Sequence, residues 1–108
     1  MPTYTSTSYV SKNVSTGGST LTTVGAATTI AVTSLVVSNT SSSPITCDVY
    51  FTRSAVNYYL IKTATIPVGG SLEVISGNRV VLIASDALVV VASASSSADA
   101  VASALVTT

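Results

Sequence analysis

Few side chains in this 108-residue chain could carry chemistry, and none of them is a histidine. Without an imidazole there is no Ser-His or Cys-His pair to activate a nucleophile, and no imidazole ligand for a metal. The four carboxylates lie in four separate places, so paired acid–base chemistry has no local signature: Asp48, Glu73, Asp86 and Asp99. We therefore expect no catalytic residue, no metal ligand and no cofactor site, and the chain is predicted not to be an enzyme.

The single cysteine, Cys47, cannot form an intrachain disulfide. It lies in an alternating run and shares a face with Val49 and Phe51. A nucleophilic thiol would need a histidine partner, which the chain lacks. The sequence predicts that Cys47 is a small buried hydrophobic residue.

Tyr58 and Tyr59 are the most prominent aromatic pair. Successive residues of a strand point to opposite faces, so we expect one tyrosine to enter the core and the other to face solvent. An exposed tyrosine beside Arg53 and Asn57 would suit a partner protein or a sugar ring. Carbohydrate binding is the weaker of these interpretations, because the chain has no Trp and few aromatic residues.

The charge content is low: 7 % of the residues are charged, against roughly 25 % in ordinary soluble domains. Ser and Thr make up a third of the chain, and the formal net charge is zero. A hydroxyl-rich surface of this kind gives little repulsion between copies and favours association. There is no basic patch to predict a nucleic-acid partner. Neither a signal peptide nor an apolar run long enough to span a membrane is present, so synthesis in a cytoplasm is expected.

The elements that position these residues are predicted to be strands, because apolar residues recur with period two and β-branched residues dominate. Turn residues separate the runs, notably Val68–Ser71 and Ser76–Asn78. A short helix over Ala98–Leu105 is the weighed alternative to a last strand. The candidate strands span about 20–24, 29–38, 45–53, 57–63, 71–75, 79–83, 87–94 and 100–107.

Eight short strands with frequent turns predict an all-β fold, a single antiparallel β-sandwich of the jelly-roll or immunoglobulin-like type, over residues 20–108. Residues 1–19 are polar and lack core periodicity, so an extended N-terminal arm is predicted there. That arm is either frayed or ordered on a neighbouring subunit through Tyr4 and Tyr9. The predicted core contains Leu35 or Val36, Val37, Val49, Phe51, Leu60, Leu72, Val74, Leu82, Leu88, Val90 and Leu105.

The order of motifs from residue 30 to 106 resembles that of small virion structural proteins of tailed bacteriophages, particularly those of marine cyanobacteria. The motifs are Leu35–Thr40, Asp48–Arg53, Ile66–Leu72, Gly77–Leu82 and Ala84–Leu88, the last with Ser85 where glycine is commoner.

This resemblance implies a capsid decoration (cement) protein, or else a neck, tail or baseplate component. It also implies location in the virion after synthesis in the host cytoplasm. The expected partners are other virion proteins and further copies of the chain in a homo-oligomer, with no nucleic acid and no membrane. A carbohydrate-binding module for host attachment is the alternative of a different class.

Overall fold

A computed structural model of the protein describes residues 3–108, with the side chains of this range except those at residues 77 and 78. The described residues form eight β-strands, and no helix long and apolar enough to cross a membrane occurs among them. The strands are β1 (Tyr4–Ser11), β2 (Ser19–Thr23), β3 (Thr29–Asn39), β4 (Ile45–Arg53), β5 (Val56–Ile66), β6 (Ser71–Leu82), β7 (Ala87–Ala92) and β8 (Ala98–Thr107).

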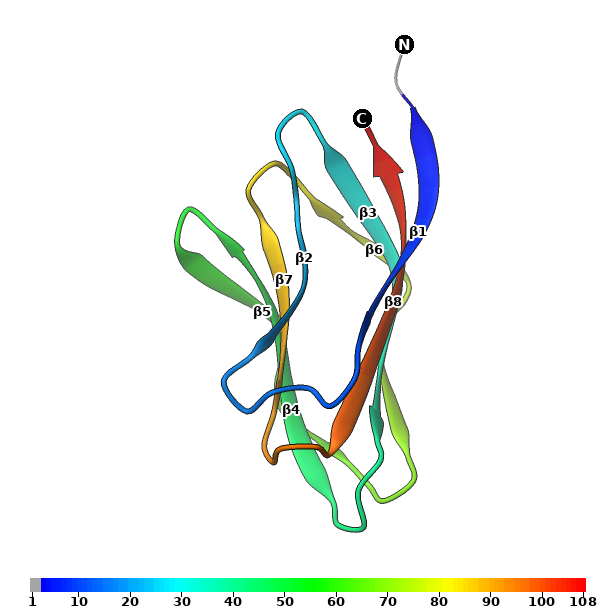
Figure 1. The fold of residues 1–108 in the computed structure, drawn as a ribbon, viewed down its shortest axis with the longest axis vertical. Coiled ribbons are helices and arrows are strands. Elements are labelled where there is room, and N and C mark those ends of the chain that lie inside the picture. The colour runs from blue at the N-terminus through cyan, green and yellow to red at the C-terminus, as the bar shows by residue number, and fades with distance from the viewer. Residues whose placement is uncertain (1–2) are drawn as a thin grey trace.

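The strands form two four-stranded antiparallel sheets packed face to face (Figure 1). One sheet has the order β1-β8-β3-β6 and the other the order β2-β7-β4-β5. Four antiparallel pairs are nested in the sequence: β1 with β8, β2 with β7, β3 with β6 and β4 with β5. This is the winding of a jelly roll, in which one long hairpin is rolled into a double sheet. The predicted all-β sandwich is confirmed, and of its two predicted types the jelly roll is the one observed.

The N-terminal segment differs from the prediction. Residues 4–11, predicted to belong to an extended arm over residues 1–19, form β1 in unbroken antiparallel register with β8. Val14, just after β1, is fully buried and donates its backbone N–H to the carbonyl of Ala98 at 2.7 Å. Main-chain hydrogen bonds to β8 order this polar segment. Apolar periodicity in the sequence does not reveal bonds of this kind. The boundary near residue 19 is therefore wrong, and the sandwich begins with β1.

β6 also differs from the prediction, because it runs continuously from Ser71 to Leu82 where two strands and a turn were expected. Its register with β3 shifts between Val32 and Ser34, which pair with Val80 and Ser76. The turn residues predicted at Ser76–Asn78 therefore lie at an irregularity within one strand. The predicted number of strands equals the observed number only because the prediction divided β6 into two strands and omitted β1.

The last strand is confirmed as a strand, and the alternative helix is not formed. Its inner face, however, is the opposite of the one predicted. A row of alanines is buried, with at most 5 % exposed, whereas Leu105 is 36 % exposed and Val101 47 %. β8 lies between β1 and β3 in its sheet, and its alanines face the interior. The buried row comprises Ala98, Ala100, Ala102 and Ala104.

Most of the predicted core is confirmed, and it forms one cluster between the sheets. The fully buried members of the prediction are Leu35, Val37, Val49, Leu82, Leu88 and Val90, and those only partly buried against the cluster are Phe51, Leu60, Leu72 and Val74. Cys47 is buried as predicted, and burial, with a smaller effect from neighbouring Asp48, raises the pKa of its thiol to about 11. The thiol is therefore neutral near neutral pH and has little nucleophilic character.

The face assignment of β8 is tested by a pair of substitutions. We expect Ala102→Leu to lower the free energy of unfolding by about 1–3 kcal/mol, because the added volume must fit a closed interior. Leu105→Ser on the opposite face should cost less than about 1 kcal/mol. Urea unfolding of the two variants measures both values. A larger loss for Leu105→Ser than for Ala102→Leu would contradict the observed orientation.

Candidate functional site

The end of the β4–β5 hairpin is the candidate site, because it gathers most of the chain's aromatic side chains. Ser54 and Ala55 connect the strands, and both have left-handed backbone conformations, with φ of 54° and 63°. Two such residues make the turn type whose twist matches that of the flanking strands. Figure 1 shows this hairpin extending away from the rest of the sandwich.

One face of the hairpin presents Tyr50 and Tyr59, which are cross-strand partners. Their ring centroids lie 5.0 Å apart with the planes tilted by 50°. The ammonium nitrogen of Lys62 lies 4.4 Å from the centroid of Tyr59, within the range of a cation–π contact. This face thus combines two hydroxylated rings with one positive charge.

The other face presents Phe51 and Tyr58, stacked with centroids 5.4 Å apart and an interplanar angle of 20°. The guanidinium carbon of Arg53 lies 5.3 Å from the centroid of Phe51. Tyr58 is 48 % exposed and Tyr59 44 %, so the expectation that one of them enters the core is wrong. β5 is an edge strand, and both of its faces are accessible at this end.

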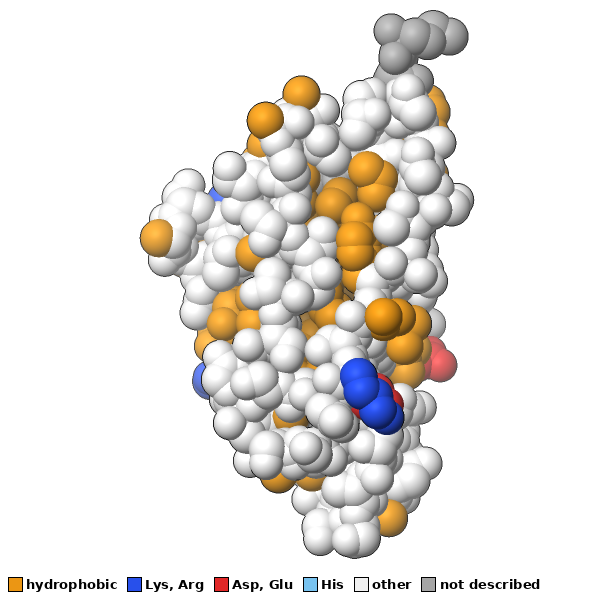
Figure 2. All heavy atoms as spheres, viewed as in Figure 1, with side chains coloured by type: hydrophobic (Ala, Val, Ile, Leu, Met, Phe, Trp, Pro, Cys, Tyr) orange, Lys and Arg blue, Asp and Glu red, His pale blue; other side chains and the backbone are white. Residues whose placement is uncertain are grey.

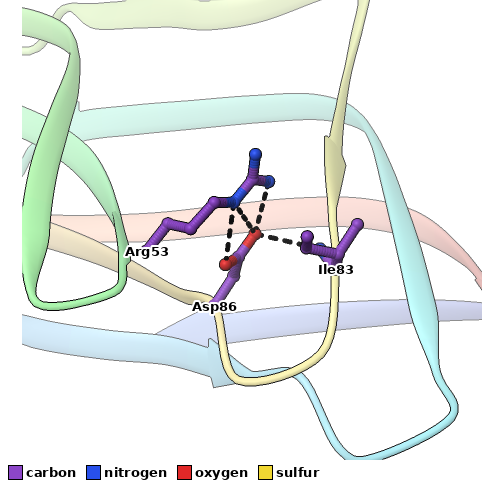
Figure 3. Close-up of polar contacts among 3 residues, drawn as sticks. All are labelled: Arg53, Ile83 and Asp86. Atoms are coloured by element: carbon purple, nitrogen blue, oxygen red, sulfur yellow. Dashed lines mark hydrogen bonds and ion pairs between the residues drawn. The ribbon is translucent and has the colours of Figure 1, made fainter.

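Arg53 is held in place by Asp86 (Figure 3). The β4–β7 register pairs Thr52 with Ala87. The residues next to this pair, Arg53 after β4 Thr52 and Asp86 before β7 Ala87, therefore lie side by side. Arg53 Nη2 donates to Asp86 Oδ2 at 2.6 Å, and its Nε lies 3.1 Å from each carboxylate oxygen. The backbone N–H of Ile83 donates to the same carboxylate at 2.9 Å. Arg53, which the sequence placed beside an exposed tyrosine, is therefore engaged with Asp86 and anchors the hairpin.

The electrostatics of Asp86 follow from these contacts. Its side chain is almost fully buried, yet the hydrogen bond from Arg53, and then that from Ile83, hold the pKa of the carboxyl below its ordinary value. The ionised form is stabilised in the folded protein, so Asp86 is not suited to donate a proton near neutral pH. Its role is structural: it joins the β4–β5 hairpin to the turn between β6 and β7.

Two other carboxylates also bind backbone N–H groups where the chain is irregular. Asp48 accepts from Thr63, a residue with φ of 53° at a bulge in β5, at 2.6 Å. Asp99 accepts from the left-handed Asn13 at 2.9 Å and pairs with Lys12 at 3.1 Å. No group of three or more Asp, Glu, Cys or His side chains suited to a metal occurs in the described part of the chain.

Asn39 is a buried polar residue that sequence reasoning missed. Its amide nitrogen donates to the carbonyls of Ser43 and Ile66 at 2.8 and 3.1 Å, and its oxygen accepts from the N–H and hydroxyl of Ser41. These bonds fix the Ser-rich loop before β4, which the sequence identified only as a loop. The signal was local: Asn followed two residues later by Ser is typical of a side-chain-stabilised turn.

A second surface feature lies over β1, β8 and β3. It is a shallow depression of about 440 Å³ lined mainly by hydroxyl side chains. Figure 2 shows one face of the molecule, on which uncharged polar side chains and backbone cover most of the surface and few charged side chains are visible. Of the two tyrosines assigned to the arm, Tyr4 is exposed and Tyr9 packs partly against the core. The residues lining the depression are Ser6, Thr7, Ser8, Thr33, Ser103, Ala104 and Leu105.

Comparison with known proteins finds this fold in a virus. Over 99 % of its length the chain matches a chain from the structure of infectious bursal disease virus, Gx strain, with a TM-score of 0.58 and 16 % sequence identity. The match covers 33 % of that viral chain, so this protein spans about one third of its length. No protein-family model and no curated protein sequence matches. The likeness shows that the two chains share a fold.

Asp86→Asn is expected to lower the free energy of unfolding by about 2–3 kcal/mol, because it weakens a buried charged network. The matched control is Asp99→Asn, whose side chain is 26 % exposed and whose cation partner is mostly exposed, and it should cost less than about 1 kcal/mol. Chemical unfolding at neutral pH measures both. A cost below about 1 kcal/mol for Asp86→Asn would contradict the anchoring role of Asp86.

The same variant tests the pH dependence. The pKa of Asp86 is lower in the folded protein than in the unfolded chain. The contribution of Asp86 to the free energy of unfolding is therefore complete at a pH above the ordinary carboxyl pKa, and it is lost as the pH falls through the folded-state pKa. Wild-type stability should therefore fall more steeply with acid than that of Asp86→Asn.

Proposed function

We propose that this chain is a non-enzymatic structural protein of a virus particle, and that it decorates or cements the head lattice of a tailed bacteriophage. It is made in the host cytoplasm and resides in the virion. Its partners are the major capsid protein and further copies of itself, with no nucleic acid and no membrane.

The observation that carries the proposal is the jelly roll itself. The fold spans almost the whole chain and matches a chain of a virus structure. Viral capsid proteins are among the classes in which eight-stranded jelly rolls occur, together with lectins and cupins. The sequence resemblance to phage virion proteins favours the first of these classes.

The surface supports a protein that is covered by neighbours. Two of the four cations are already neutralised within the chain, Lys12 by Asp99 and Arg53 by Asp86. With a net charge of zero and hydroxyl side chains over much of the surface, copies repel one another little. Three of the four carboxylates, those of Asp48, Asp86 and Asp99, accept backbone N–H groups, which favours a structural role for them.

Placement in the neck, tail or baseplate uses the same properties and remains an alternative location for the same role. The number of copies in a particle separates the two, because a head lattice repeats a decorating protein far more often than a tail or neck does.

Carbohydrate binding is a second candidate function, favoured by the exposed rings of Tyr58 and Tyr59. An aromatic face with a nearby hydroxyl and ammonium group can stack on a sugar ring and bind its hydroxyls. Lys62 beside Tyr59 supplies such a donor. Lectins are also jelly rolls, so the fold is compatible with this function.

Quantitative mass spectrometry of purified particles of the virus that encodes this chain tests the main proposal. We expect hundreds of copies per particle when the major capsid protein serves as the internal standard. A few dozen copies or fewer would place the protein in the neck, tail or baseplate. Its absence from purified particles would refute the virion role.

Glycan-array binding tests the second candidate. If the hairpin binds sugars, Tyr59→Ala should weaken binding at least about tenfold, since stacking on one ring supplies much of the contact. Tyr4→Ala, which removes an exposed tyrosine far from the hairpin in sequence, is the matched control and should bind normally. Failure of the wild type to bind any glycan would eliminate this candidate.

A further inference from the structure

The two sheets end in four edge strands, and three of these carry features that discourage pairing with another chain. β2 is five residues long and bulged. β5 contains Lys62 followed by the left-handed Thr63 at a bulge. β6 contains Glu73 and Arg79, and its register with β3 shifts twice.

β1 has none of these features. Its eight residues pair with β8 without a register shift, and the strand contains no charged residue, proline or glycine. Tyr4 and Val10, near its two ends, are 64 % and 69 % exposed. An edge that is long, regular and uncharged is a ready template for another strand.

The hydrogen-bond pattern shows which backbone groups of β1 are free to pair. Thr3 and Thr108 exchange both N–H···O bonds, each 2.9 Å long, so they form a hydrogen-bonded pair of the antiparallel ladder. Such pairs alternate along a ladder, so the odd-numbered residues of β1 direct their N–H and C=O groups toward β8. The even-numbered residues direct theirs toward the open edge: Tyr4, Ser6, Ser8 and Val10.

We propose that two copies of the chain associate through β1, paired antiparallel about a twofold axis at Thr7. In this register Tyr4 lies opposite Val10 of the second copy, and Ser6 lies opposite Ser8. Each of these pairs exchanges two hydrogen bonds, so all four open residues of both strands are used. A shift by two residues in either direction would leave Tyr4 or Val10 without a partner.

The side chains favour the same register. Val10 is adjacent to Val101 on β8, which is 47 % exposed, and Tyr4 of the second copy would cover both. Aromatic and β-branched residues directly opposite each other form favourable cross-strand pairs. No like charges meet, because the nearest charged residue, Lys12, lies beyond the strand and is paired with Asp99.

The contact is isologous, so it closes at two copies and joins the two β1-containing sheets into one continuous sheet. The inference concerns the association of the chain with itself and does not rest on the proposed role in a virus particle.

A cysteine cross-link tests the register. Thr7 pairs with itself across the axis as a non-hydrogen-bonded pair, with Cα atoms about 4.5 Å apart, which suits a disulfide. Mild oxidation of Thr7→Cys should give a disulfide-linked dimer on a non-reducing gel. Thr5→Cys is the matched control: Thr5 would lie opposite Tyr9, leaving the two introduced thiols roughly 13 Å apart. The native thiol of Cys47 is buried and does not compete.

The cross-link also excludes exchange of β1 between copies. In an exchanged dimer Thr7 would lie beside Ala104 of the other copy, as it lies beside its own Ala104 now, and Thr7→Cys would not link. Cross-linking of Thr5→Cys as fast as Thr7→Cys, or of neither variant, would overturn the proposed pairing.

A proline substitution tests the main-chain bonds in analytical ultracentrifugation. The N–H of Ser8 faces the open edge, so Ser8→Pro removes an interface donor without removing a bond to β8. We expect a dimer for the wild type, a dissociation constant raised at least about tenfold for Ser8→Pro, and one changed less than about twofold for Ser8→Ala. Circular dichroism checks that the variants fold, and Ser8→Lys replaces the proline variant if it does not. A monomeric wild type, or a folded proline or lysine variant that dimerises normally, would refute the proposal.

Discussion

The fold depends on backbone pairing between strands that are far apart in the sequence. Three of the nested antiparallel pairs are of this kind, the first strand with the last, the second with the seventh and the third with the sixth, and the β4–β5 hairpin is the fourth pair. Together with the pairing of β8 with β3 and of β7 with β4, these nested pairs fix the order of both sheets. Because main-chain groups carry this pairing, a chain with few charges and many hydroxyls can still form a single fold.

Several of the few charged and amide side chains bind backbone N–H groups at the places where strand pairing is interrupted. Asp48, Asp86 and Asp99 each accept a backbone N–H at a bulge or turn, and Asn39 does the same in the loop before β4. Such groups would otherwise be left without a partner, at a cost of about 1–3 kcal/mol each when buried. The acidic residues of this chain are thus committed to its architecture, in agreement with the proposed structural role.

Period-two patterning was sufficient to predict a sandwich, the strand at β8 and the burial of Cys47, because these depend on local alternation. It could not detect β1, whose polar residues are ordered by hydrogen bonds to a strand almost a hundred residues away. It also favoured Leu105 over the alanines of β8, because a large apolar side chain is the usual core residue, whereas the packing between the sheets that buries small residues is not encoded in local alternation. The link between Arg53 and Asp86 depends on the register of β4 and β7, which no sequence spacing encodes.

The position of β8 has a consequence for how the protein is made. β8 follows the other seven strands in the sequence, yet it lies inside its sheet, between β1 and β3. While a ribosome is still synthesising residues 98–107, the two strands that flank β8 have already emerged and lack the partner that joins them. Closing such long loops is slow, and open strands are prone to pair wrongly during the delay. The nascent chain therefore passes through an interval in which its open strands are exposed, and a chaperone that shields them would raise its yield.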